Sequence, residues 1–525
     1  MAEFSQPPQK IRRSTPGDEQ AMGAWLVERK WMIIEQEREL QEKAVAMPAQ
    51  LAPLPQRCSQ VEVLHFYLPN TLWTKLAEIT NRNLAKRPSS DSRYQTTTVE
   101  ELKKWYGFQL VMENTYSNSF TAIAVHFAHV KRELGSVRGL GLDRFSVLSN
   151  DCCPTAEELI QLSCIIEGSS KSQLLRAKVV VIDESVIGYQ PSEAVRTRSE
   201  REGTPIPVVY IPRKPHPNGL LCYLASTYVS DPNSPGFLPF IVSMVPHVRI
   251  GDFTNAEAAK HIINSWMAPQ PHWIVDAGFG SEELVQLATQ RGGSMTASIS
   301  QVQMGSLWKA LSFSVPPGCW RAATNGTGMV ASVHCGEADG RGRTLQRILS
   351  SNWELPVAPH QFPSAECPGG DDDKEVEGSD QVIPTYSRET LEGHTVVQLK
   401  EICRKWGIKP AVGKEAIIQG IVTRVEIVHK KHSDVEAMER ILGSQYFHGD
   451  GPLHQVYKSH FNWVDLADRS WNMVEEHHPH RDWKIKYLLL LLRFAVLNAM
   501  THSKQNHGEN WKQFRATVAR QLIQT

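Results

Sequence analysis

The chain has 525 residues, of which 41% are hydrophobic, so it is long enough for two to four globular domains. It contains 56 Lys and Arg residues and 56 Asp and Glu residues, a balance that excludes a strongly basic or acidic protein. A surface for a polyanion such as nucleic acid would have to be a local patch.

The cysteines and the apolar segments of the sequence predict the cellular compartment of the protein. The nine cysteines include no C-x-x-C pair, which is typical of a reducing compartment and argues against a zinc module. The first residues lack the apolar stretch of a signal peptide. The longest apolar run, Tyr487–Met500, is too short for a bilayer and contains Arg493. We expect a soluble, intracellular protein with no membrane partner.

The first 170 residues are predicted to be a linker region followed by helices. Residues 1–60 indicate a disordered arm, a charged helix over about 20–42 and a Pro-rich linker. From 61 to 170, apolar residues recur at helical spacing, as in 71–79 and 99–111. We expect an all-helical domain there that serves dimerisation or DNA binding.

The pattern changes at Lys178, where strands and helices begin to alternate. Buried strands are predicted at 178–189, 208–211, 219–225 and 239–245, a helix at 255–267, a strand from 273, a helix from 281 and a strand from 294. Residues 171–300 therefore predict a mixed α/β sheet flanked by helices.

The remainder divides into four segments. Residues 301–365 predict a β-rich insertion whose pairing the sequence does not settle, and 366–389 an acidic linker. Residues 390–432 predict two amphipathic helices, and His394 to His432 contains eight Lys and Arg against three Glu. Residues 440–525 return to helices, including a strongly apolar one from Trp483 to Met500.

Three acids stand at the ends of regular elements. Asp183 follows the β-branched run Val179–Ile182, and Asp276 follows a second buried strand. An acid in that position either caps a turn or serves as a metal ligand or base. Asp465 and Asp468 are three residues apart and share a face of a predicted helix. Two acids at strand ends and one from a later helix suit a pair of Mg²⁺ ions about 4 Å apart that catalyse phosphodiester transfer.

Other polar residues receive simpler interpretations. Glu184 should leave the strand on the side opposite to Asp183, so we do not expect it to be a ligand. The histidines at 477, 478 and 480 lie in a polar loop and are interpreted as surface groups, with metal binding as the alternative. Trp483 either stacks on a nucleic-acid base or packs in the core.

Four blocks in order resemble the piggyBac-type transposases of the DDE class. Val181–Tyr189 is similar to the family's first-Asp motif, and Tyr210–Leu220, which includes Lys214, resembles its Y-x-P-x-K-P block. The block at Asp276–Leu284 is similar to D-N-W-F-T-S-x-x-L. Val464–Arg469 resembles V-D-x-x-D, followed by an R-W…N helix that reaches Asn498.

This resemblance implies an RNase H-like core with a catalytic triad of Asp183, Asp276 and Asp465, accompanied by Asp468 as a metal ligand. It implies two Mg²⁺ or Mn²⁺ ions and double-stranded DNA as partner, namely transposon ends and TTAA-type targets. Excision would proceed by hydrolysis and hairpin formation, in a homodimer located in the nucleus. Lys214 and Trp483 are the DNA contacts that the matched blocks imply.

The chain also departs from the family pattern. Ala277 and Gly278 follow Asp276 where Asn and Trp are usual, and no Cys-rich zinc domain is evident. The helix pair at 390–432 resembles a SAP module, in which Lys409, Lys414 and a helix N-terminus would bind phosphates. An ordinary helical hairpin with a solvated basic face is the alternative.

Two functions follow from these observations. The first is an active metal-dependent transposase, favoured by the intact acids. The second is a domesticated DNA-binding protein without transposition activity, favoured by the missing zinc domain and by the changed residues after Asp276.

Overall fold

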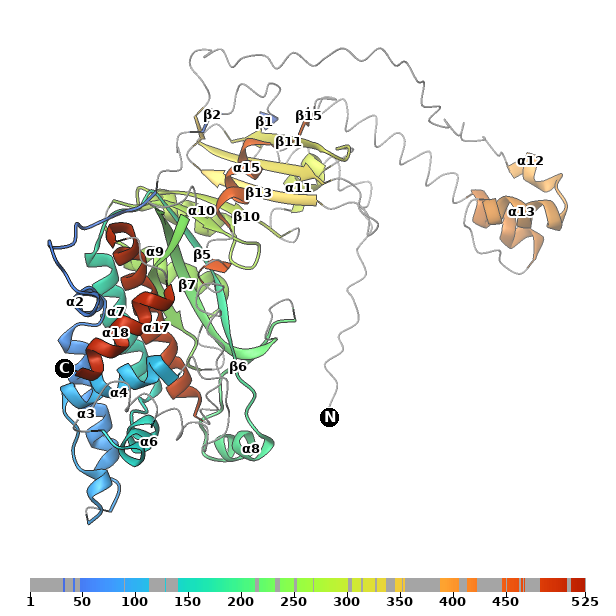
Figure 1. Cartoon of the computed structure of the whole chain (residues 1–525). Helices are drawn as coiled ribbons and strands as arrows, with labels where there is room; N and C mark the ends of the chain where they lie inside the picture. The colour runs from blue at the N-terminus through green and yellow to red at the C-terminus, as the bar shows by residue number, and fades with distance from the viewer. Residues whose placement is uncertain are drawn as a thin grey trace.

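The structure is a computed structural model of the whole chain (Figure 1). The residues that it describes are 32–33, 41–42, 48–88, 90–112, 128, 140–212, 217–231, 237–249, 253–267, 269–300, 305–312, 315–325, 328–336, 345–351, 353–354, 388–405, 413–422, 446–449, 451–461, 464–465, 467, 482–507 and 511–524. Lys214, Lys409 and Asp468 lie outside the described residues.

An eleven-stranded mixed sheet forms the centre of the protein. Its core strands are β5 (Val179–Gly188), β7 (Asn218–Ser230), β8 (Phe237–Pro246), β9 (His272–Val275) and β10 (Ser294–Ser298). β5, β7 and β8 are antiparallel neighbours, whereas β9 and β10 continue the sheet in parallel from β5. The short β6 (Val208–Tyr210) pairs with the start of β7. The RNase H-like mixed sheet flanked by helices that the sequence predicts is confirmed.

Parallel strands require crossover connections, and helices supply them. α9 (Asn255–Ser265) joins β8 to β9, and α10 (Glu282–Gln290) joins β9 to β10. Thr254 caps α9 with a complete capping box, and Ser281 caps α10 by accepting a hydrogen bond from the Leu284 amide. Both helices begin within one residue of their predicted starts.

The segment from 61 to 170 is helical, as expected. Its helices are α2 (Gln60–Tyr67), α3 (Asn70–Leu84), α4 (Val99–Met112), α6 (Leu142–Asp151) and α7 (Ala156–Ser172), with a short turn η2 (Ser92–Tyr94). Capping boxes at Ser59 and Thr155 start α2 and α7. α7 packs on β8, so this helical segment continues directly into the sheet's core.

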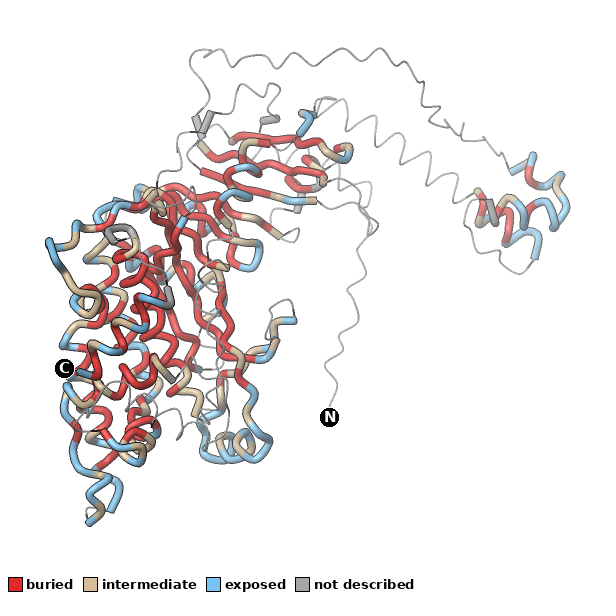
Figure 2. Tube along the Cα trace, viewed as in Figure 1, coloured by how far each residue is buried: buried red, intermediate tan, exposed pale blue. Residues whose placement is uncertain are grey.

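The helix α17 (Trp483–His507) lies between the sheet and the N-terminal helices (Figure 2). It contacts α2, α7, β7, β8 and α18 (Trp511–Gln524), and α18 packs on α2 and α4. Among the described residues α17 is the helix long and apolar enough to cross a membrane, but 94% of its most apolar stretch is buried inside the protein. Its apolar surface therefore belongs to the core.

Asn498 fixes α17 to the outer strand β8. Its side-chain oxygen accepts a hydrogen bond from the Ile241 amide at 2.8 Å, and its nitrogen donates to the Ile241 carbonyl at 2.7 Å and to Ser170 Oγ at 3.0 Å. The pairing of β7 with β8 shifts between Ala225 and Ser226, next to this contact. The amide of Asn498 thus satisfies backbone groups that the irregular strand pair leaves open.

Residues 301–365 extend the main sheet. β11 (Cys319–Thr324), β12 (Met329–Cys335) and β13 (Leu345–Ser351) form an antiparallel meander whose last strand pairs with β10. A helix, α11 (Gly305–Ser312), contacts β11 and β12. The outer strand β11 also pairs with β15 (Phe447–His448), so the segment after the SAP-like helices rejoins the sheet.

The prediction of a helix over 20–42 is wrong for the part that the structure describes. Met32–Ile33 forms β1, which pairs with β11, and Gln41–Glu42 forms β2, which pairs with β14 (Trp353–Glu354). Farther along, β3 (Gln50–Leu51) pairs with β4 (Leu174–Arg176). Backbone N–H and C=O groups at exposed strand edges form hydrogen bonds with these short segments. This pairing between distant parts of the chain outweighs the helical preference of the local sequence.

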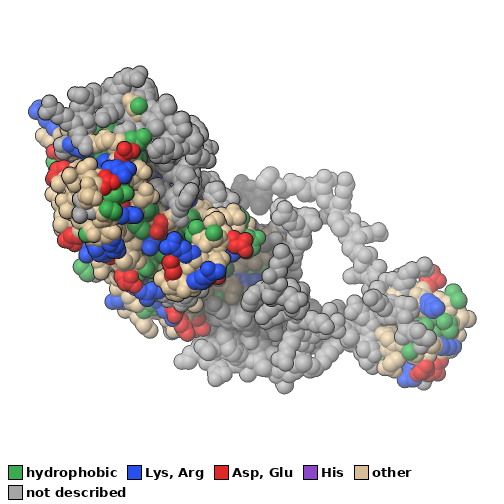
Figure 3. Space-filling view, turned by 90° about the horizontal axis from the view of Figure 1, so that it is seen from below, with side chains coloured by type: hydrophobic (Ala, Val, Ile, Leu, Met, Phe, Trp, Pro, Cys, Tyr) green, Lys and Arg blue, Asp and Glu red, His purple; other side chains and the backbone are tan. Residues whose placement is uncertain are grey.

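The SAP-like segment has a small core of its own. α12 (Arg388–Glu392), α13 (Val396–Lys405) and a helix at 414–422 bury Leu391, Leu399, Cys403, Ile417, Ile418 and Ile421 in a cluster separate from the main core. We call residues 388–422 the helical module. Its face seen at the right of Figure 3 mixes acidic, basic and apolar side chains. The described residues thus form a second, small folding unit.

Replacing Asn498 with Leu should lower the free energy of unfolding by about 2–4 kcal/mol, because the amide and carbonyl of Ile241 lose their buried partners. Thr501→Val is the matched control on the same buried helix, since Thr501 donates a single bond to the Pro239 carbonyl. Urea denaturation followed by tryptophan fluorescence measures both. Equal destabilisation by the two variants would contradict the special role of Asn498.

Candidate functional site

The pairing of β5 with β9 brings Asp183 and Asp276 together. In this parallel pair Ile182 lies beside Val275, so the next residues, Asp183 and Asp276, are neighbours at the sheet edge where β9 ends. Val179–Ile182 and all of β9 are buried, which anchors both backbones. Asp276 therefore follows the carboxyl end of β9, a place where α/β sheets commonly bind ligands, whereas Asp183 lies within β5. The expectation that Asp183 ends its strand is wrong, because β5 continues to Gly188 through its pairing with β7.

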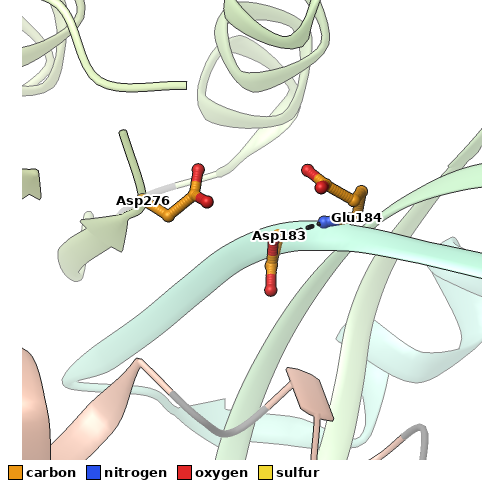
Figure 4. A group of neighbouring side chains, drawn as sticks. All are labelled: Asp183, Glu184 and Asp276. Atoms are coloured by element: carbon orange, nitrogen blue, oxygen red, sulfur yellow. Dashed lines mark hydrogen bonds between the residues drawn. The ribbon is translucent and has the colours of Figure 1, made fainter. Parts of the chain in front are cut away.

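A third carboxylate joins them. Asp183, Glu184 and Asp276 each offer an oxygen, and these atoms lie within 4.8 Å of one another. We call these three residues the carboxylate cluster. Glu184 is 3% exposed, whereas Asp183 and Asp276 are partly exposed. Asp183 and Glu184 leave β5 on opposite sides, as strand alternation predicts, and Asp276 lies beside them (Figure 4). Three hard oxygen donors at this spacing suit Mg²⁺ or Mn²⁺.

Glu184 was not expected to be a ligand, because it leaves β5 on the side opposite to Asp183, yet its carboxylate lies near that of Asp276. The alternation along β5 is as expected, but Asp276 stands just past the end of β9, where its carboxylate approaches both sides of the neighbouring strand. A strand rises only ~3.3 Å per residue, so adjacent side chains on opposite sides remain close to a group at the strand edge. The cluster of three carboxylates depends on where Asp276 lies in the loop after β9, and the side-chain alternation along a strand does not predict that position.

Backbone hydrogen bonds orient both aspartates. The Glu184 amide donates to Asp183 Oδ1 at 2.8 Å, and the Gly278 amide donates to Asp276 Oδ1 at 2.8 Å. The amides of Phe279 and Gly280 donate to the Asp276 carbonyl at 3.1 and 2.8 Å, which closes a tight turn before α10. These hydrogen bonds fix the orientation of both carboxylates.

This turn has space only for small residues. A Cβ on Gly280 would lie 2.0 Å from the Ser298 carbonyl oxygen, a backbone atom of the neighbouring strand β10. A Cβ on Gly278 would lie 3.0 Å from Asn255 Nδ2 and 3.1 Å from Asp276 Oδ1, which are side-chain atoms. Gly278, one of the departures noted in the sequence, thus leaves the Asp276 carboxylate uncrowded.

Glu184 lies in an aromatic environment. Tyr223 is its direct partner across the β5–β7 pair, and the Tyr223 ring packs edge to face with Phe279, centroids 5.9 Å apart. Burial, with further contributions led by Glu184, raises the pKa of Tyr223 to about 12. Tyr223 therefore stays a neutral hydroxyl, which donates to the Phe253 carbonyl at 3.2 Å.

The opposite face of the sheet, on which Asp183 lies, carries buried polar residues. His272 lies on this face because it pairs with Val179 in the same alternation. Its ring nitrogens contact Ser294 Oγ at 2.7 Å and Thr296 Oγ1 at 2.9 Å, and Thr296 contacts Ser350 Oγ at 2.8 Å. Burial, and then the nearby His460, lowers the pKa of His272 to about 4.

His460 belongs to α15 (Pro452–His460), which packs on β10 and β13. α15 therefore covers the face that carries Asp183. The helical residues Val464 and Asp465 follow it. Asp465 is partly exposed and is not a member of the carboxylate cluster. The structure brings Asp183 and Asp276 together and leaves the third predicted acid on the segment that follows the covering helix.

The predicted DNA contacts that the structure describes have protein partners. Lys414 is exposed, and its ammonium donates to the Glu392 carbonyl at 2.7 Å, closing the end of α12. Trp483 is half-buried at the start of α17, with its ring 6.0 Å from that of Tyr487. Trp483 also packs against the main core. Both residues thus have structural roles in the isolated chain.

Comparison with solved structures identifies a similar fold. The chain resembles the cryo-EM structure of the piggyBac transposase synaptic complex with hairpin DNA, with a TM-score of 0.55 and 12% sequence identity over 90% of this chain and 83% of that chain. No protein-family model and no curated protein matches the sequence. The likeness is therefore one of fold.

Gly280→Ala should destabilise the protein by at least about 2 kcal/mol, because the added Cβ meets a backbone oxygen that cannot move alone. Gly278→Ala is the matched control, since its neighbours are side-chain atoms that can shift by a few tenths of an ångström. Thermal unfolding of both variants checks this. A Gly280→Ala protein that melts together with Gly278→Ala would show that the turn is not constrained as described.

The buried His272 should make stability depend on pH. Because its folded-state pKa is depressed, the unfolded chain binds the proton first, so stability is lost as pH falls from about 6.5 to about 4 and changes no further below that. The full loss is about 3 kcal/mol. Denaturation at several pH values should show a smaller loss for His272→Gln than for the wild type. The exposed His261→Gln serves as control and should keep the wild-type slope.

Proposed function

We propose that this chain is a DNA transposase of the piggyBac type that uses divalent metal ions to cut and join DNA. The observation that carries the proposal is the meeting of Asp183, within β5, and Asp276, just past the end of the neighbouring β9, on a fold similar to that of a piggyBac transposase. The substrates are the transposon ends and TTAA-type targets that the sequence motifs imply. We further propose that it acts as a homodimer on paired DNA ends in the nucleus.

The carboxylate cluster would hold the metal. Three carboxylates within 4.8 Å repel one another, and Glu184 is deeply buried, so a divalent cation between them relieves an unfavourable charge. Two Mg²⁺ or Mn²⁺ ions, when bound, activate the attacking oxygen and stabilise the leaving oxygen of an in-line displacement. The chain's part is to hold Asp183 and Asp276 in fixed orientations through the amides of Glu184 and Gly278.

Asp465 and Asp468 are proposed as the ligands that complete the site. Asp465 follows α15, which covers the face carrying Asp183, so this segment is on the side of the sheet from which a third acid would approach the cluster. We propose that metal and DNA together draw it in. Lys214 and Trp483 are proposed to contact the DNA.

Metal binding can be tested apart from catalysis. Asp183→Asn should raise the melting temperature of the metal-free protein, because it removes one of three repelling charges. The wild type should gain about 2.7 kcal/mol at a Mn²⁺ concentration 100 times the dissociation constant, whereas Asp183→Asn, Glu184→Gln and Asp276→Asn should each lose most of this gain. Glu282→Gln, an acid on the nearby α10, is the control and should behave as the wild type.

Activity needs its own assay. Wild-type protein with Mg²⁺ or Mn²⁺ should cleave DNA ends flanked by TTAA, and Asp183→Ala should reduce the rate at least about 1000-fold, a loss expected when a metal ligand is removed. Metal and DNA binding without cleavage by the wild type would instead support the second candidate, a domesticated DNA-binding protein. That alternative is favoured by the position of Asp465 outside the cluster.

The helical module is proposed as a DNA-docking unit. Its buried residues form a cluster separate from the main core, and the sequence around it is locally basic. Deleting residues 390–430 should weaken DNA binding at least about tenfold and flatten its salt dependence, because fewer phosphates are neutralised. Metal-dependent thermal stabilisation of the main fold should be unchanged. Undiminished DNA affinity after the deletion would rule out this role.

A further inference from the structure

Two buried cysteines lie directly opposite each other at one end of the β11–β12 pair. Cys319 pairs with Cys335 in the antiparallel register, so both side chains lie on the same face of the sheet. Directly opposed residues have Cα atoms ~4.5–5.5 Å apart, which is within the range that a disulfide bridges. Neither cysteine is in a disulfide, and they are 1% and 0% exposed, in a small cluster with Val315 apart from the main core.

A histidine lies beside Cys319 on the third strand, β15, which pairs with β11 on the side away from β12. β15 pairs with β11 such that His448 lies opposite Cys319, and its Nδ1 is 3.4 Å from Cys319 Sγ. His448 itself is exposed, so its ring connects the buried thiol with solvent. Three neighbouring strands thus place a base, a thiol and a second thiol side by side.

The groups around Cys319 favour this thiol as the one that loses its proton and reacts first. Burial raises the pKa of the Cys319 thiol, and the neighbouring Cys335 adds to this, so the thiolate does not form unaided. His448 can accept the proton. Arg321, two residues along β11 and therefore on the same face, adds a buried positive charge that favours a thiolate, and its guanidinium lies over the Tyr446 ring at 5.6 Å.

We propose that Cys319, His448 and Cys335 form an oxidisable dithiol site that a small peroxide converts to a disulfide. His448 takes the proton of Cys319, and the thiolate attacks one peroxide oxygen of hydrogen peroxide, which gives a Cys319 sulfenic acid and releases hydroxide. Cys335 then attacks the Cys319 sulfur, so the S–S bond forms as water leaves. In sum, two thiols are oxidised and one peroxide is reduced to two waters.

The size of the oxidant follows from the burial of the thiols. Hydrogen peroxide is little larger than water and can follow the exposed edge at His448, whereas a glutathione molecule cannot reach a sulfur that is 1% exposed. The bond would tie β11 to β12 at the end where β15 attaches. Oxidation would therefore hold the outer part of the sheet in its paired arrangement.

Mass spectrometry can test the site directly, since trypsin separates the two thiols. Cleavage after Lys309, Arg321 and Arg341 gives peptides 310–321 and 322–341 with one cysteine each. Full-length protein treated with hydrogen peroxide, then blocked with N-ethylmaleimide while denatured, should yield these peptides linked and 2 Da below the sum of their masses. Reduction with dithiothreitol should release both.

Variants separate the roles. Cys335→Ser should leave a Cys319 sulfenic acid that dimedone traps when the protein is denatured in its presence. His448→Phe should slow disulfide formation at least about tenfold with the same final product. Cys164→Ser, which removes an exposed cysteine, is the control and should react as the wild type. Cys319 and Cys335 that stay reduced at a peroxide dose oxidising Cys164 would overturn the proposal. An unchanged rate in His448→Phe would overturn the role of His448.

Discussion

The parallel pairing of β5 with β9 is the constraint on which the rest of the structure depends. Parallel neighbours need a long crossover, so the chain travels through β7, β8 and α9 before it returns beside β5. The return in a single register makes Asp183 and Asp276 adjacent. A shift by one residue would send one acid to the other face and would move every side chain of β9 to the opposite side of the core. The hydrophobic core and the acidic site are thus fixed by the same hydrogen bonds.

The elements around this pair were predictable because their signals are local. β-branched runs identify β5 and β9, and hydroxyl caps at Thr254 and Ser281 identify the starts of the two crossover helices. An acid follows each of these runs, so Asp183 and Asp276 could also be found in the sequence, although β5 continues beyond Asp183 to Gly188. Their adjacency depends on the pairing of β5 with β9, which are separated in the chain by β7 and β8, and no local signal predicts that pairing.

Other features depend on contacts between distant segments and could not be predicted. Met32–Ile33 is a strand because β11 offers an open edge, although the local sequence favours a helix. Glu184 joins the cluster because of a turn after β9, and strand periodicity alone places it elsewhere. The row of His448, Cys319 and Cys335 depends on the registers of three strands, one of which is more than a hundred residues away in the chain.

The packing of α17 and α18 has a consequence for how the chain folds. Hydrogen bonds join the N-terminal helices to α17 and α18. The Val61 amide donates to Gln521 Oε1 at 2.9 Å, and Arg515 donates to the Leu110 carbonyl. His502 contacts both the Tyr67 hydroxyl and the Ala52 carbonyl. These contacts join residues about 400–460 positions apart. During synthesis the first helices therefore leave the ribosome with their apolar faces uncovered, and they stay so until the last forty residues emerge. A chain whose contacts join residues so far apart in sequence folds slowly. Its exposed apolar surfaces must be protected from aggregation until these contacts form.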